Sequence, residues 1–187
     1  PDLDNKQFVF EPVFYDLDLN ATFKVRVLDN GKEVYSQKVP ASDNAFISAK
    51  IKNIKTWSPE SPFLYDIEFS VLDAEGNTID KVKSYAGMRK VELRGKTFYL
   101  NNEPYYQRLV LDQGYYPDGQ WTAPDDEQLK KDIILAKEAG FNGARLHQKV
   151  FEQRYFYWAD KLGYLTWGES ASWGMDWTSP LAARNMI

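Results

Sequence analysis

The stretch "GFNGARLHQ" (Gly140–Gln148) combines a helix end, a short apolar run and a group of polar residues. Glycine is typical of helix ends because it accepts the left-handed backbone that often follows the last turn. The apolar run predicts a short strand, and His147, the only histidine of the chain, directly follows it. The stretch "GYLTWGES" (Gly163–Ser170) repeats this order. Together they predict helices that alternate with strands, with polar groups at the strand ends.

The flanking residues extend this alternation in both directions. "RLVL" (Arg108–Leu111) predicts a strand buried on both faces. One helix is expected from an N-cap at Thr122 to Gly140, and a second from about Phe151 to Leu162. The resulting order, strand–helix–strand–helix–strand, indicates parallel strands joined by right-handed crossovers.

Polar residues follow each of the three expected strands. Asp112 follows the first strand, His147 and Gln148 the second, and Glu169 the third. Parallel α/β sheets collect functional groups at the carboxyl ends of their strands, so these side chains are expected along one rim. The stretch "YYPDGQW" (Tyr115–Trp121) is expected to form a loop over that rim. Tyrosine and tryptophan present flat apolar faces with a polar tip, which suit stacking on sugar, so Tyr116 and Trp121 are expected sugar contacts.

The chain before this region follows a period of two, which is typical of half-buried strands. "ATFKVRVLDNGKEVYSQKV" (Ala21–Val39) alternates apolar and charged residues around a hairpin turn at Asp29–Gly31. A second hairpin begins at Phe63–Leu72, and a small one is expected to turn at Asn101 and Asn102. Short strands separated by turns indicate an antiparallel sandwich of roughly 90 residues.

The composition narrows the function classes. The 187 residues carry a formal net charge of −4 without a basic run, which argues against a nucleic-acid-binding protein. No apolar stretch approaches the length of a membrane span, so no membrane partner is expected, and the first residues do not resemble a signal peptide. The absence of cysteine excludes disulfides, thiol catalysis and cysteine-ligated zinc, but it leaves the compartment open.

Five segments of the sequence resemble glycoside hydrolase family 2, the β-galactosidase and β-glucuronidase group. They occur in the family's order and spacing: "WSPESPFLYDIEFSV", "SYAGMRKVEL", "FYLNNEP", "DDEQLKKDIILAKEAGFNGAR" and "WADKLGYLTWGE". Three positions depart from the usual family pattern. His147 stands where serine is usual, Gln148 where histidine is usual, and Gly168 where aspartate is usual.

The resemblance implies a multi-domain chain. Residues 1–94 would form an all-β immunoglobulin-like sandwich, and residues 95–187 would form an incomplete α/β (TIM) barrel of about three strands. The implied function is that of a fragment of a retaining β-glycosidase acting on terminal β-galactosides or β-glucuronides. In this family the two catalytic glutamates lie at barrel strands four and seven, which are expected beyond Ile187. The chain alone is therefore expected to be inactive.

The residues expected to bind a carbohydrate substrate are those of the rim and of the strands that reach it: Arg145, His147, Gln148, Glu169, Asp112 and Trp167. Arg145 is expected to hold a catalytic carboxylate or a sugar hydroxyl, or to pair inside the barrel. Trp167 and Trp173 are expected either to stack on sugar or to pack in the core. No metal and no cofactor are expected. The open strand edge of a partial barrel predicts self-association.

Two other hypotheses compete with the interpretation of the chain as a fragment of a glycosidase. The chain is alternatively a non-catalytic carbohydrate-binding or spacer module whose α/β half is a small domain of its own. A purely structural, adhesion-type sandwich is the third reading, but it leaves the α/β half unexplained. Saturable binding of galactosides, glucuronides or mannosides by the chain alone would favour the binding module.

Overall fold

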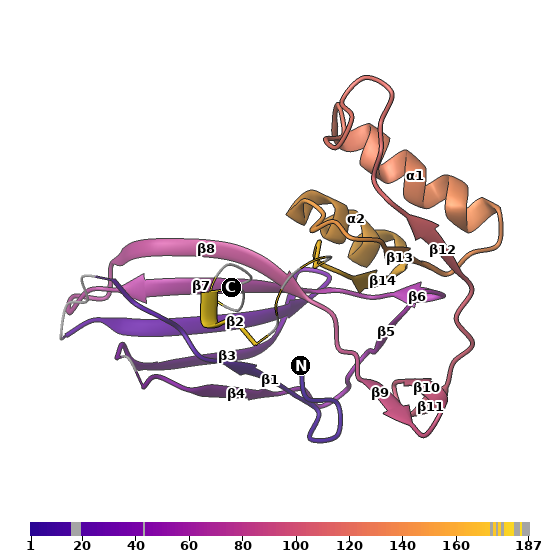
Figure 1. The fold of residues 1–187 in the computed structure, drawn as a ribbon. Helices are drawn as coiled ribbons and strands as arrows, with labels where there is room; N and C mark the ends of the chain where they lie inside the picture. The colour runs from indigo at the N-terminus through magenta and orange to yellow at the C-terminus, as the bar shows by residue number, and fades with distance from the viewer. Residues whose placement is uncertain are drawn as a thin grey trace. The chain divides into compact units, whose positions relative to one another are not determined.

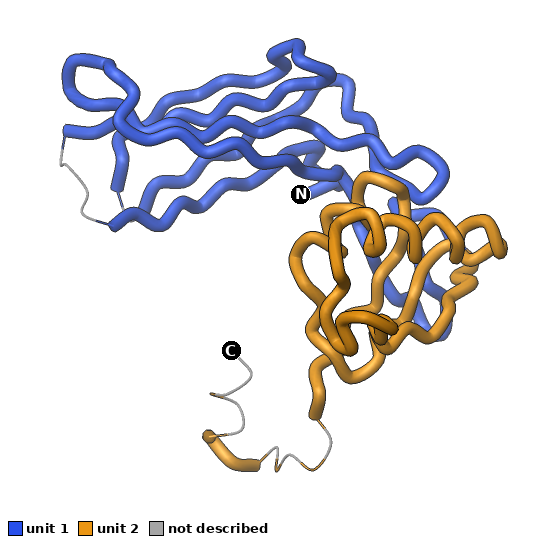
Figure 2. The backbone as a smooth tube through the Cα atoms, turned by 90° about the horizontal axis from the view of Figure 1, so that it is seen from above, with its two compact units in different colours: residues 1–105 blue, residues 106–187 orange. Residues whose placement is uncertain are grey.

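The computed structural model describes residues 1–15, 20–42, 44–172, 174, 176, 178–181 and 184. The chain divides into two compact units, Pro1–Tyr105 and Tyr106–Ile187, which Figure 2 shows in different colours. The sequence suggested a boundary at residue 94, whereas the hairpin that follows this position lies within the first unit. The chain is mostly β with few helices.

Unit 1 contains a four-stranded antiparallel sheet, visible in Figure 1. Its strand order is β3-β2-β7-β8, with bounds β2 Thr22–Asp29, β3 Lys32–Pro40, β7 Tyr65–Leu72 and β8 Thr78–Ala86. The turn between β2 and β3 falls at the expected residues. Asn30 and Gly31 both have positive φ (50° and 80°), as the favoured two-residue hairpin turn requires.

A second, smaller sheet completes the sandwich. It pairs β1 (Gln7–Phe10) with β4 (Ile47–Lys50). Phe8 and Ile47 from this sheet join Val25, Tyr65 and Ile67 from the larger sheet in one buried cluster, so the two sheets share a core. Short strands lie beside it: β5 Trp57–Ser58, β6 Ser61–Pro62, β9 Val91–Arg94, β10 Thr97–Leu100 and β11 Glu103–Pro104.

Unit 2 has the alternating order that the sequence predicted. Its elements are β12 Leu109–Asp112, α1 Asp126–Glu138, β13 Gly143–Leu146, α2 Gln153–Leu162 and β14 Leu165–Gly168. β12 pairs with β13, and β13 with β14, both in parallel. The expectation of parallel strands is therefore confirmed.

The helices of unit 2 cover one face of this sheet. Leu129 and Ile133 of α1, and Tyr155 and Ala159 of α2, share a buried cluster with Ala144 and Leu146 of β13. The opposite face is less covered, and Leu111 on β12 is 52% exposed. The prediction that this strand is buried on both faces is therefore wrong, because helices pack against only one side of the sheet.

The helix ends have identifiable causes. Asp125, not Thr122, is the N-cap of α1, because its side chain accepts a hydrogen bond from the backbone N–H of Gln128 (2.8 Å). α2 begins at Gln153, slightly later than predicted, and ends at Gly163, whose backbone is left-handed. Lys137, near the end of α1, donates from Nζ to the carbonyl oxygens of Leu162 and Gly163 at the end of α2.

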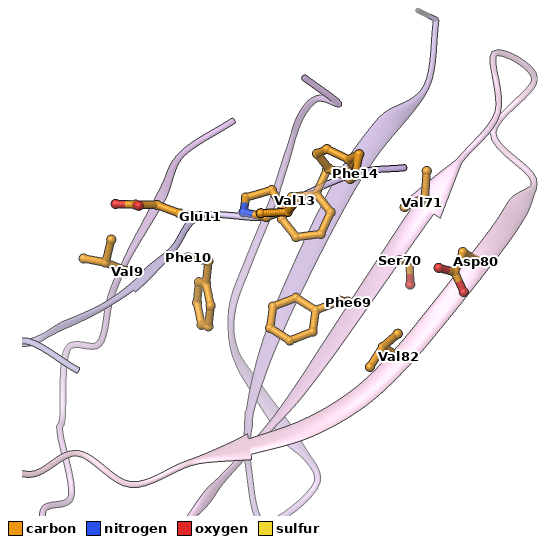
Figure 3. A pocket seen from close by; sticks show the side chains of 12 residues that line it. Val9, Phe10, Glu11, Val13, Phe14, Phe69, Ser70, Val71, Asp80 and Val82 are labelled. Carbon is orange, nitrogen blue, oxygen red and sulfur yellow. The ribbon is translucent and has the colours of Figure 1, made fainter. Parts of the chain in front are cut away.

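A hollow of about 480 Å³ lies in unit 1 (Figure 3). Phe10, Phe14, Phe23 and Phe69 form much of its lining, next to β1 and over β7 and β8. Its polar lining comes mainly from Glu11, Ser70 and Asp80, and Figure 3 shows the Glu11 side chain directed away from Asp80. The few polar groups of a typical binding site converge on the ligand, whereas Glu11 and Asp80 of this hollow point in different directions.

Neither helix of the described part of the chain has the length and hydropathy needed to cross a bilayer.

Candidate functional site

The carboxyl ends of the three parallel strands of unit 2 lie in register. Asp112 pairs with Leu146, and Leu146 pairs with Gly168. The hydrogen bonding continues past β13, because the backbone N–H of His147 donates to the carbonyl oxygen of Asp112 (2.7 Å). The polar residues that follow the strands therefore begin at one common edge of the sheet, which we call the rim.

An ion pair joins two of the expected site residues at the rim. The Arg145 guanidinium donates from Nε to Glu169 Oε1, and the backbone N–H of Gln148 donates to Glu169 Oε2 (3.3 Å). Gln148 has a positive φ of 55°, which is uncommon for a residue with a side chain. The hydrogen bond from Arg145 lowers the pKa of Glu169, so this carboxyl is ionised at neutral pH.

His147 is held by a residue that the sequence did not single out. The amide nitrogen of Gln113 lies 3.0 Å from His147 Nδ1. An amide nitrogen donates hydrogen bonds, so this contact fits the neutral tautomer in which Nδ1 accepts and Nε2 carries the proton. In this tautomer, Nε2–H is the group of the imidazole that can donate a hydrogen bond to a ligand.

Asp112 is directed differently from the other expected site residues. Its Oδ1 accepts a hydrogen bond from the backbone N–H of Gly114 (2.8 Å), and its Oδ2 lies 3.5 Å from the hydroxyl of Tyr155. Tyr155 belongs to the buried cluster under the helices, where desolvation raises its pKa. Asp112 thus supports the loop that follows β12 and does not line the hollow described below.

Three side chains form a row on the face of the sheet that the helices do not cover. Arg145 on β13 is paired with Leu111 on β12 and with Trp167 on β14. Side chains of directly paired residues point to the same face of a sheet. Trp167 is 45% exposed and the Arg145 side chain 51%, so core packing of Trp167 is not observed among the described residues.

A hollow of about 200 Å³ lies beyond the strand ends. Three of the residues expected to contact the substrate line it, namely His147, Gln148 and Trp121. The other residues that line it are Gln113, Tyr115, Lys149 and Ala171. Tyr115 and Trp121 are exposed and meet edge to face with ring centroids 5.8 Å apart. Tyr116, an expected sugar contact, is instead buried in the core beneath. Trp173 lies outside the described residues.

Lys149 supports the loop beside the hollow, and sequence reasoning missed it. Its side chain is only 9% exposed although lysine is usually a surface residue. One feature of the sequence is consistent with this role. Gly114 follows the end of the first strand, at the point where the loop passes close to Lys149.

Within the described ranges, no three His, Cys, Asp or Glu residues are grouped so that they could hold a metal ion. The rim instead offers imidazole, amide and guanidinium groups beside exposed aromatic rings. Such a set suits a hydroxyl-rich ligand with flat apolar faces.

Comparison with known proteins identifies the family. Residues 13–89 match the model described as "Glycosyl hydrolases family 2". A β-galactosidase from Pseudoalteromonas haloplanktis is 31% identical over 134 residues, which is 72% of this chain and 13% of that protein. The chain belongs to glycosyl hydrolases family 2. The resemblance inferred from the sequence is thereby confirmed.

Solved structures of two glycosidases share the fold. A β-glycosidase from Bacteroides vulgatus matches 96% of this chain and 23% of its own with a TM-score of 0.81 and 22% identity. A β-glucuronidase from Bifidobacterium dentium matches 89% of this chain and 28% of its own, with a TM-score of 0.80 and 23% identity. The chain spans only 13% to 14% of the length of the first curated relatives it matches.

Proposed function

We propose that this family 2 chain forms part of a retaining β-glycosidase that acts on terminal β-galactosides or β-glucuronides. In this proposal unit 1 is an immunoglobulin-like sandwich. Unit 2 supplies three successive strands of a (β/α)8 catalytic barrel. These two parts correspond to the domains expected from the sequence, residues 1–94 and 95–187. The boundary is placed between Tyr105 and Tyr106, where the two compact units meet in the sequence.

One observation carries the proposal: the parallel sheet has helices on one face and the row Leu111, Arg145 and Trp167 on the other. In a (β/α)8 barrel the helices pack outside, and the other face of the strands points into the barrel. Functional groups of such barrels lie at the carboxyl ends of the strands. The rim of unit 2 is the corresponding edge.

In this proposal, the rim residues bind substrate and do not perform the catalytic proton transfers. Arg145, Trp167 and Glu169 face the sugar from the inner side. His147 and Gln148 face it from the strand ends, and Asp112 holds the adjoining loop. A general acid needs a carboxyl that stays protonated near neutral pH, whereas Arg145 lowers the pKa of Glu169. A lowered pKa excludes only the role of general acid, because the nucleophile of a retaining glycosidase is ionised. The catalytic pair is assigned to other strands because the family resemblance places both glutamates at barrel strands four and seven.

The choice of sugar rests on the relatives. The curated relatives are named β-galactosidases, and the neighbouring structures are a β-glycosidase and a β-glucuronidase. The proposed partner of the rim is accordingly the sugar ring of a β-linked substrate, bound without cofactor or metal.

The single histidine permits a direct test. The imidazole signals of His147 are unique in a proton NMR spectrum of this chain. We expect methyl β-D-galactopyranoside or methyl β-D-glucuronide to shift them in a saturable manner with a dissociation constant in the millimolar range. The chain should release no nitrophenol from the corresponding nitrophenyl glycosides.

Two arginines that each pair with a carboxylate form a matched control. Arg145→Met should weaken the sugar-dependent shift, whereas Arg154→Met, which breaks the ion pair with Asp126 on the helices, should leave it unchanged. Unchanged His147 signals at saturating concentrations of both sugars would refute the proposal. Micromolar affinity of the chain alone would instead favour the stand-alone binding module.

A further inference from the structure

Lys149 occupies an unusual position for a lysine, between the rim and the loop that follows β12. The Lys149 side chain is nine-tenths buried, although Tyr115 and Trp121 of the neighbouring loop are exposed. Its Nζ donates to the carbonyl oxygens of Trp121 (2.6 Å) and Gly114 (3.2 Å). These two carbonyls lie at opposite ends of residues 114–121, so a single ammonium group closes the loop.

The surroundings of Lys149 fit this role. The carboxylate of Glu152 lies 3.8 Å from Nζ, and the ammonium lies 4.6 Å from the ring centroid of Phe151 and 5.6 Å from that of Tyr116. Hydrogen bonds from a charged donor are about twice as strong as neutral ones, and a buried charge is costly when it loses its partners. The carbonyl groups of Gly114 and Trp121 stabilise the buried ammonium group of Lys149, and these hydrogen bonds hold the loop in place.

The backbone of the loop approaches the ammonium closely. A Cβ atom built on Gly114 would lie 2.7 Å from Lys149 Nζ and 2.8 Å from Phe151 Cζ, and the φ of Gly114 is +63°. A residue other than glycine would meet both a steric clash and an unfavourable backbone conformation. The loop therefore depends on glycine at the point where it crosses Lys149.

The closed loop places an aromatic pair next to the polar residues of the rim. Tyr115 and Trp121 flank the closure and expose 62% and 54% of their surface, and both line the hollow together with His147 and Gln148. The hollow lies beyond the strand ends, whereas Arg145 and Trp167 lie within the strands on the inner face. If the sugar of a glycoside lies at the inner face, the leaving group attached to that sugar extends past the strand ends and reaches Tyr115 and Trp121.

We propose that Lys149 is a positioning residue, which fixes Tyr115 and Trp121 as a subsite for a flat, apolar leaving group, such as an aryl ring, of a β-glycoside. This inference rests on the proposed function, since it takes the sugar to lie at the rim. It adds a preference for the leaving group, which depends on the loop and not on the sugar-binding residues.

The test compares two glycosides that differ only in the leaving group. Binding of methyl and phenyl β-D-galactopyranoside to the chain, and of the matching glucuronides, is followed by the His147 signals. We expect the phenyl glycoside to bind about twofold to tenfold more tightly, as an aromatic contact provides. Lys149→Met should abolish this preference while methyl glycoside binding is retained, and Lys149→Arg should restore part of it.

Hydrogen exchange tests the loop closure without any ligand. In Lys149→Met, the amides of residues 114–122 should exchange about tenfold faster or more, because two charge-assisted hydrogen bonds are lost. Lys161→Met is the matched control, since it also removes a lysine that lies over an aromatic ring, Tyr157 (5.7 Å), on α2. Its loop exchange and its preference for the phenyl glycoside should equal those of the unaltered chain.

Gly114→Ala displaces the same loop without changing a charge, and it should also abolish the preference. Unaltered loop exchange in Lys149→Met would overturn the role of Lys149. Equal binding of methyl and phenyl glycosides by the unaltered chain, or a preference that survives both variants, would overturn the subsite while leaving the proposed function intact. Binding of no glycoside at all would refute the proposed function, and the subsite with it.

Discussion

The two units of this chain bury their sheets in different ways. In unit 1 the four-stranded sheet shares a core with a second sheet, so that Val25, Tyr65 and Ile67 are almost completely buried. In unit 2 the parallel sheet is covered by α1 and α2 on one face, while Leu111, Arg145 and Trp167 remain substantially exposed on the other. The sheets of unit 1 pack against each other, whereas the sheet of unit 2 packs on one face and leaves the other face available for further contacts.

This contrast separates residues that determine stability from residues available for function. A buried side chain in either unit contributes through packing, and its loss leaves a cavity. A side chain on the open face of unit 2 has few packing partners to lose.

The strongest effect is expected in the core of unit 1. Tyr65→Ala should lower the free energy of unfolding of this unit by about 3–5 kcal/mol, because it empties the space of a fully buried ring. Tyr65→Phe is the control, since it removes only the hydroxyl that accepts a hydrogen bond from the Lys55 backbone N–H (2.7 Å), at a cost of about 1 kcal/mol. Urea denaturation measures both values. Equal losses for the two variants would contradict the packing explanation.

The two faces of the sheet in unit 2 should respond unequally to truncation. Ile133→Ala on α1, which is fully buried, should cost about 2–5 kcal/mol. Leu111→Ala on the open face should cost less than about 0.5 kcal/mol, as exposed positions usually do. Hydrogen exchange of the β13 amides provides the measurement. A loss of similar size for Leu111→Ala would show that this face is packed in solution.

The smallest effect concerns the pH dependence of the rim. Glu169 has a lowered pKa in the folded chain, so its stabilising contribution is present above its unfolded pKa and is lost as the pH falls through its folded pKa. Arg145→Met should raise the pKa of Glu169 towards its ordinary value, as measured by carbon NMR of the carboxyl group.

Asp73 in unit 1 is the control for that measurement. Its pKa is lowered mainly by the neutral Asn77 side chain and by backbone N–H groups, not by an arginine. The Arg145→Met substitution and added salt should therefore leave the pKa of Asp73 nearly unchanged. A Glu169 pKa that does not move would mean that the Arg145 ion pair is absent in solution.

Local patterns in the sequence were sufficient to predict much of this fold. The turns at Asn30–Gly31 and Asn101–Asn102, and the end of α2 at Gly163, were predicted because each rests on a backbone conformation that few residue types adopt. The parallel order of β12, β13 and β14 followed from the alternation with helices. The family followed from the ordered motifs and not from any single one.

The errors arose where distant residues decide the outcome. Asp125 and Thr122 are both good N-caps, and only the position of the Gln128 N–H selects Asp125. The exposure of Leu111 depends on which face the helices cover, which a short apolar run does not encode. Tyr115 and Tyr116 are neighbours of the same type, and only the packing of the loop against the helices shows that Tyr116 is the buried one.

The contact between Lys137 and the carboxyl end of α2 limits how this fold can be recombined. One lysine on α1 satisfies carbonyl oxygens of Leu162 and Gly163 on the following helix. A chimera that exchanges the first strand–helix segment for that of a relative without a donor at this position would leave those carbonyls unpaired. Crossover points for chimeras that keep this contact therefore lie before Tyr106 or after Gly163.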